Sequence, residues 1–200
     1  LLICITSLVP PAELVSQLAT YNKRREFHKT LSTFNQWRED NAPAKRKPPR
    51  AAYVEAIVAH SKRRSGEAAL EIFQEMQADG IKPDLRAYTT AIRACASRKL
   101  WPVALSLFED LRADGLEADT VACNAALVAC ERGGQLEEAE LLLDAMRTHG
   151  PPPDTISHNT VISTASRLGR WQHALALLDA MERESVASTG ELVGHSNDGS

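Results

Sequence analysis

The sequence predicts an all-α fold, an α-solenoid of antiparallel helical hairpins arranged as tandem 35-residue repeats. The 200-residue chain is 44% apolar but only 5% aromatic, which provides for a core and is typical of helix-rich proteins. A tripeptide ending in aspartate recurs every 35 residues, with Asp84, Asp119 and Asp154 at its last position. Apolar residues follow the same step, and a fixed period of this length indicates a repeat architecture.

The period divides residues 50–189 into four units, and each unit is predicted to be a helical hairpin. In the first unit, Tyr53 and Ile57 are spaced as on one face of a helix, and Ala69 and Phe73 have the same spacing further on. The four units are 50–84, 85–119, 120–154 and 155–189. Three positions of the second helix stay apolar in all of them: Ala69, Ala104, Ala139 and Ala174; Phe73, Phe108, Leu143 and Leu178; Met76, Leu111, Met146 and Met181.

The ends of the predicted helices carry residues that stop and start helices. Gly80 suits a left-handed cap of the second helix, and Pro83 prevents its continuation. Asp84 then stands where the next helix needs an N-cap acceptor. A hairpin cannot bury both of its apolar faces alone, so neighbouring units have to stack. The counterparts one and two steps on are Gly115 and Gly150, and Asp119 and Asp154.

Residues 1–49 are predicted to form a degenerate N-terminal repeat with a basic connector. Thr30, Phe34 and Trp37 align with the apolar positions of a second helix, which places Leu18 on an earlier one. The connector, "NAPAKRKPPR", is longer and more basic than the links between the other units.

The two ends of the chain carry little periodicity. Residues 190–200 are predicted to be a disordered tail. The apolar run at 1–9 is too short for a membrane span. Because the chain begins with Leu rather than Met, we expect a truncated N-terminus, so that a targeting peptide is not visible.

These motifs resemble the pentatricopeptide repeat family over residues 50–189. The matches are "AALEIFQEMQADGIKPD" at 68–84, "EEAELLLDAMRTHGPPPD" at 137–154 and "SHNTVISTASRLGRWQHALALLDAM" at 157–181. The resemblance implies a right-handed α-solenoid that binds single-stranded RNA at one base per repeat. It further implies RNA-processing proteins as additional partners, and a role in transcript processing, stability or translation in the chloroplast or mitochondrion.

Charge is sorted between the two helices of each unit, although the net charge of −3 by itself argues against a polycation. The first fifteen residues of the four units contain ten basic and two acidic residues, and the next sixteen contain four basic and fourteen acidic ones. If the first helices line the concave face, that face is positive and can bind phosphates. The alternative is that these charges complement the helix dipoles. The predicted phosphate-binding residues are Lys62, Arg98, Arg132 and Arg167.

By the resemblance, the fifth and last residues of each unit select a base. A carboxylate only accepts hydrogen bonds, and guanine and uracil alone carry a ring N–H on the Watson–Crick edge, so aspartate favours these two bases. The family analogy implies that Thr89 with Asp119 reads G. It also implies that Asn124 with Asp154 reads U. The two outer pairs, to which no base is assigned, are Val54 with Asp84 and Asn159 with Thr189. The second residues of the units, predicted to stack on bases, are Ala51, Arg86, Val121 and Ile156.

The sequence predicts no catalytic residues, no metal site, no cofactor, no membrane association and no small-molecule substrate. The four cysteines form no C-x-x-C pair, and Cys95 and Cys130 share an apolar register that favours a place in the core. Two alternatives to RNA binding remain open. One is a protein–protein interaction scaffold of the tetratricopeptide class, whose repeat has 34 residues. The other is a repeat fragment of a larger RNA-processing protein.

Overall fold

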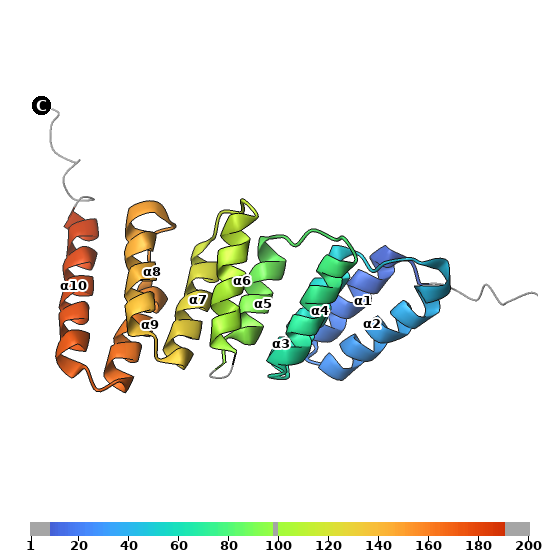
Figure 1. Cartoon of the computed structure of the whole chain (residues 1–200), viewed down its shortest axis with the longest axis horizontal. Helices are drawn as coiled ribbons and strands as arrows, with labels where there is room; N and C mark the ends of the chain where they lie inside the picture. Colours follow the sequence, from blue (N-terminus) through green and yellow to red (C-terminus); the bar gives the residue numbers. More distant parts are fainter. Residues whose placement is uncertain (1–8, 98–99, 191–200) are drawn as a thin grey trace, which may run out of the picture.

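The computed structural model describes residues 9–97 and 100–190, with the backbone alone for 184–190, and consists of helical hairpins side by side in chain order (Figure 1). This arrangement confirms the predicted α-solenoid. No helix within the described ranges is long and apolar enough to cross a membrane. The helices are α1 (Pro11–Lys23), α2 (Phe27–Asn41), the 3₁₀ turn η1 (Ala42–Ala44), α3 (Arg50–Lys62), α4 (Gly66–Ala78), α5 (Leu85–Cys95), α6 (Trp101–Ala113), α7 (Thr120–Gly133), α8 (Leu136–His149), α9 (Thr155–Arg167) and α10 (Trp171–Gly190).

The two helices of each hairpin belong to two layers. The first helices α1, α3, α5, α7 and α9 pack closely on one another in succession. Within the described residues, successive second helices lie further apart and are linked by long side chains, as where Arg38 of α2 pairs with Glu75 of α4 and His173 of α10 contacts Glu140 of α8. Closer spacing in one layer makes the array curve toward that layer. The first helices therefore form the inner layer of the solenoid, and their solvent-facing side chains form what we call the inner surface.

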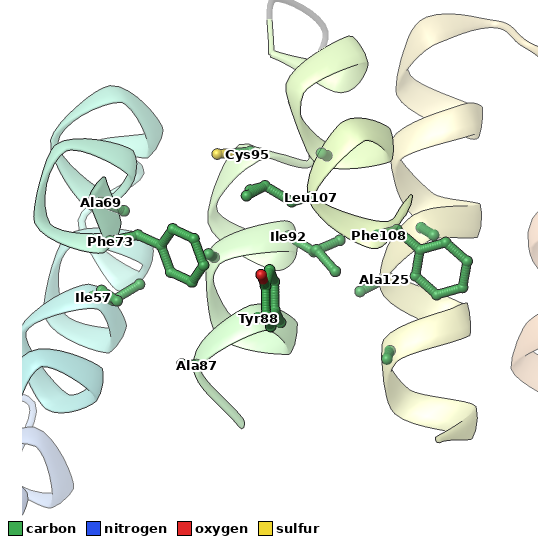
Figure 2. Packing of buried hydrophobic residues seen from close by; sticks show 14 of the residues in the cluster. Ile57, Ala69, Phe73, Ala87, Tyr88, Ile92, Cys95, Leu107, Phe108 and Ala125 are labelled. Atoms are coloured by element: carbon green, nitrogen blue, oxygen red, sulfur yellow. The ribbon is translucent and has the colours of Figure 1, made fainter. Parts of the chain in front are cut away.

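Aromatic rings join successive hairpins through the core. Phe73 of α4 lies against Tyr88 of α5, with ring centroids 5.1 Å apart (Figure 2). One repeat earlier, Phe34 of α2 meets the edge of Tyr53 of α3 at 5.4 Å. All four rings are at most 1% exposed, and such aromatic pairs add about 0.5–1.5 kcal/mol to the free energy gained from burial. The aromatic residue at the fourth position of a repeat thus ties it to the repeat before.

The predicted N-caps are confirmed at three helices. One oxygen of Asp84 accepts a hydrogen bond from the backbone N–H of Ala87 at 2.9 Å, and Asp119 caps α7 in the same way at 2.7 Å. Asp154 caps α9 by accepting from the N–H of Ser157 at 2.8 Å, and the Ser157 hydroxyl oxygen accepts from the backbone N–H of Asp154 at 3.1 Å, which completes a capping box.

The predicted left-handed glycine caps hold at two positions and are wrong at the third. Gly80 and Gly115 have φ of 74° and 75°. Gly150 is extended, with φ −107° and ψ −171°, and α8 runs on to His149. The reason is the next residue, Pro151, because proline drives the residue before it into the extended region.

Burial of the thiols makes stability depend on pH in the alkaline range. Burial raises the pKa of Cys95 and Cys123 to about 11 and that of Cys130 to about 12, from 9.0. The folded chain therefore keeps these protons after the unfolded chain has lost them. Their stabilising effect is complete below pH 9 and is lost as the pH rises toward the folded-state values. Burial likewise raises the pKa of Tyr53 and Tyr88.

We expect the free energy of unfolding, measured with urea, to fall steadily between about pH 9 and 11. A variant with Cys95→Ala and Cys130→Ala removes two of the three thiols that are described as buried and should show a shallower fall. Equal slopes for the two proteins would contradict the assignment to the thiols.

Candidate nucleic-acid interface

The second residue of each unit lies on the inner surface, one helical turn before the fifth. Val121 is 52% exposed and Ile156 is 60% exposed, although both are apolar. Arg86 is also exposed, and Ala51 is partly buried. Exposed apolar side chains at equivalent positions of α7 and α9 suit contact with the flat face of a base. Their role in stacking stays a prediction.

One predicted pair of base-selecting residues meets directly in the structure. The Nδ2 of Asn124 donates to both carboxylate oxygens of Asp154, at 3.1 and 3.2 Å. The Oδ1 of Asn124 accepts a hydrogen bond from the Ser157 hydroxyl at 2.7 Å. α7 thus supplies the amide, and the start of α9 supplies the carboxylate and the hydroxyl. The sequence analysis missed Ser157, for which the D-x-x-S spacing of the capping box is the available signal.

Hydrogen bonds stabilise the ionised form of Asp154. Partial burial alone would raise its pKa, but the hydrogen bonds from the Ser157 backbone and from the Asn124 side chain outweigh this effect, so the pKa of Asp154 is lowered. The group is therefore a carboxylate that only accepts hydrogen bonds at neutral pH. This is the property on which the predicted preference for uracil depends.

The pair predicted to read G, Thr89 with Asp119, contains a hydroxyl without a hydrogen-bond partner. Thr89 is 9% exposed, and its Oγ1 is a buried atom without a hydrogen-bond partner. Asp119, the other member of the pair, is exposed and caps α7. A buried hydroxyl without a partner costs about 1–3 kcal/mol, and at this degree of burial Thr89 offers little surface to a base.

The two outer pairs differ from the central ones. Val54 is only 2% exposed, so it offers almost no surface to a base, and its partner Asp84 forms an ion pair with Arg50 at 3.4 Å. The burial of Val54 counts against its predicted role. Asn159 is exposed on α9. The backbone of Thr189 belongs to α10, and its side chain is outside the described part of the chain.

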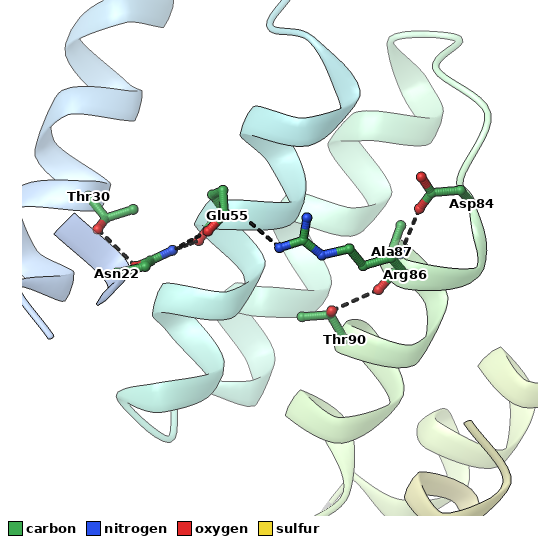
Figure 3. A network of polar contacts seen from close by, with 7 residues as sticks. All are labelled: Asn22, Thr30, Glu55, Asp84, Arg86, Ala87 and Thr90. Atoms are coloured by element: carbon green, nitrogen blue, oxygen red, sulfur yellow. Dashed lines mark hydrogen bonds and ion pairs between the residues drawn. The ribbon is translucent and has the colours of Figure 1, made fainter. Parts of the chain in front are cut away.

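Arg86 is held by a polar network that the sequence analysis missed (Figure 3). Its Nη2 donates to Oε1 of Glu55 at 2.7 Å, and Oε2 of Glu55 accepts from Nδ2 of Asn22 at 2.8 Å. Thr30 in turn donates to Oδ1 of Asn22 at 2.9 Å. Glu55 is 6% exposed, whereas the Arg86 side chain is 64% exposed. The network therefore ties α1 and α2 to α3 and α5, and it neutralises one of the inner-surface cations.

The predicted phosphate-binding residues fall into two groups. Lys62 and Arg132 are exposed near the ends of α3 and α7, and among the described residues neither forms an ion pair. Arg167 pairs with Glu131 of the preceding unit at 3.2 Å. Arg98 lies outside the described residues. The two acidic residues of the first-helix segments, Glu55 and Glu131, thus each bind an arginine of the next repeat.

The fold and the inner surface define a helical-repeat protein that presents equivalent positions of successive hairpins to an extended ligand. The sequence model of the pentatricopeptide repeat domain matches residues 59–101 and 106–168, and that of the PPR repeat matches residues 156–186. The chain belongs to the pentatricopeptide repeat family. None of the curated proteins matches it significantly.

Solved structures of this family share the fold. PPR10 in complex with an 18-nucleotide psaJ RNA element matches with a TM-score of 0.75 and 23% identity, over 88% of this chain and 25% of that chain. The PPR domain of Arabidopsis thaliana protein-only RNase P 1 in complex with tRNA matches with a TM-score of 0.73 and 16% identity, over 92% of this chain and 97% of that chain. PPR10 from maize matches with a TM-score of 0.53 and 24% identity, over 86% of this chain and 29% of that chain. The present chain thus spans about a quarter of the length of PPR10.

Proposed function

We propose that the chain binds single-stranded RNA on its inner surface with selectivity for sequence. In this proposal it acts on organellar transcripts, in their processing, stability or translation, by covering a site or recruiting other RNA-processing proteins, and it has no catalytic activity of its own. The observation that carries the proposal is the Asn124–Asp154 pair. The RNA named in the descriptions of PPR10 and of the RNase P domain supports it by analogy.

The geometry around Asp154 fits uracil better than cytosine. Val121 lies one turn before Asn124 on α7, and Ile156 lies two residues after Asp154, so exposed apolar side chains of both helices are available to a base near the pair. The N3–H of uracil can donate to the carboxylate. The N3 of cytosine carries no hydrogen and would bring a lone pair against that carboxylate.

A fluorescence titration with short labelled RNAs tests the proposal. We expect an RNA that contains G-U to bind more tightly than a scrambled RNA or the matching DNA. The affinity should fall as salt rises between about 50 and 200 mM, because bound phosphates release counterions. Absence of salt-dependent RNA binding would favour a protein–protein scaffold instead.

The contribution of the inner-surface cations can be measured separately. Arg132→Gln should weaken binding to every RNA sequence alike and reduce the slope of log K against log salt by about 0.7, the value for one phosphate contact on a single strand. The matched control is Arg112→Gln on α6 in the second-helix layer, which should leave the slope unchanged. A loss of the same size in both variants would indicate only a general effect of net charge.

A further inference from the structure

Two hairpins place a tyrosine at the fourth position of the repeat in the same way. Tyr88 on α5 lies against Phe73, and its hydroxyl donates to Asp114 at the end of α6 at 2.8 Å. Tyr53 on α3, one repeat earlier, likewise donates to Asp79 at the end of α4. Each ring is therefore held by an aromatic wall from the hairpin before, and each hydroxyl by a polar group from its own hairpin.

The next hairpin lacks this ring. One repeat after Tyr88 the residue is Cys123 on α7, and one repeat after Asp114 it is His149 at the end of α8. The aromatic wall is kept, because Phe108 of α6 is the equivalent of Phe73. Because a thiol replaces the phenol, Phe108 has no tyrosine ring at this position to pack against.

A cleft of about 590 Å³ lies beside Cys123 and is lined by residues of α6, α7 and α8. Its lining includes Phe108, Cys123 and Met146, and its rim includes the exposed residues Arg112, Glu117 and His149. The volume is in the range of ligand pockets, and so is the combination of apolar walls with a few polar groups. In the following hairpin, the position equivalent to Cys123 holds His158. This side chain is itself buried and hydrogen bonds to the backbone oxygen of Asp154 at 3.0 Å.

We propose that this cleft binds a phenol ring, the tyrosine side chain of a partner protein. The ring packs against Phe108 in the place that Tyr88 takes against Phe73. The hydroxyl bonds to His149, whose Nδ1 is already paired with the Thr148 hydroxyl at 2.7 Å and whose Nε2 is left for the ligand. The cleft is larger than one ring, so residues that flank the tyrosine can reach Arg112 and Glu117 at the rim.

The cleft lies in the second-helix layer, so a partner bound there leaves the inner surface accessible. The proposal is independent of RNA binding, since none of the residues that line the cleft is among the predicted base-selecting, stacking or phosphate-binding residues.

Methyl NMR of the whole chain tests the proposal, because the chain has three methionines and one of them lines the cleft. N-acetyltyrosinamide, titrated up to about 20 mM, should shift the methyl signal of Met146 and leave that of Met76, buried in another hairpin, unchanged. N-acetylphenylalaninamide should bind several-fold more weakly, because it lacks the hydroxyl. An unmoved Met146 signal would overturn the proposal.

Cys123→Tyr restores the missing ring and is the decisive variant. It should abolish binding of N-acetyltyrosinamide and raise the melting temperature, whereas Cys95→Ala on α5 should leave the binding unchanged. Undiminished binding in a folded Cys123→Tyr variant would place the ligand elsewhere. If that variant does not fold, Phe108→Leu should weaken binding several-fold by removing the aromatic wall. Binding of p-cresol without binding of the blocked tyrosine would contradict a protein partner.

Discussion

Phe73→Ala is expected to lower the free energy of unfolding by about 3–5 kcal/mol, the usual cost of removing a fully buried phenylalanine. The side chain is 1% exposed, and it is the aromatic wall for Tyr88, 5.1 Å away between centroids. Its loss therefore creates a cavity and also weakens the link between two hairpins. Urea unfolding followed by circular dichroism measures the effect.

The matched variant is Phe108→Ala, at the same position one repeat later. Phe108 is 7% exposed and borders the cleft beside Cys123 instead of a tyrosine ring. Part of its contact surface is already missing, so we expect a smaller loss of about 2–3 kcal/mol. Equal losses for the two variants would show that the cleft does not weaken this interface.

Asp154→Asn is expected to remove the preference for U over C at one position of the RNA. A well-made set of base contacts discriminates by about 1–3 kcal/mol, or roughly 5- to 150-fold in affinity. Asparagine caps a helix about as well as aspartate, so α9 should stay intact. The amide offers both a donor and an acceptor and no longer rejects the unprotonated N3 of cytosine.

Competition between RNAs that differ in this one base measures the change, and Asp84→Asn is the control. Asp84 has the same capping role at α5, but the fifth residue of its unit, Val54, is buried. This control should leave base preference unchanged. A variant Asp154→Asn that keeps the full preference for U over C would defeat the readout hypothesis, because the acceptor-only carboxylate is gone.

The repeat period and the end residues of the helices made most of the fold predictable. Ala69, Phe73 and Met76 are buried as their spacing indicates, and Asp84 caps a helix at the step that the sequence predicts. These features depend on neighbours within about one turn or one repeat. The exception at Gly150 is local too, because the proline that follows it was visible in the sequence.

The candidate site was less predictable, because it depends on which side chains meet across repeats. The family resemblance implied that Asn124 and Asp154 act as a pair, and the two side chains do meet in the structure. The pairing of Arg86 with Glu55 depends on how α3 packs against α5, so a count of charged residues in each segment could not predict it. Val54 has the repeat position of a base-selecting residue but is covered once α3 is enclosed by its neighbours. The cleft beside Cys123 became apparent only when equivalent interfaces could be compared.

The separation of the second helices has a mechanical consequence. The first helices lie close to their successors, whereas in the described part of the chain the second helices lie further apart and are linked by side chains such as Arg38 and Glu75. A small rotation of one hairpin relative to the next therefore changes the separation of the second helices more than that of the first helices. Such rotation widens or narrows the outer gaps while the inner contacts persist. The buried aromatic pairs between hairpins, such as Phe73 with Tyr88, resist this rotation, so they limit how far the array can change its curvature.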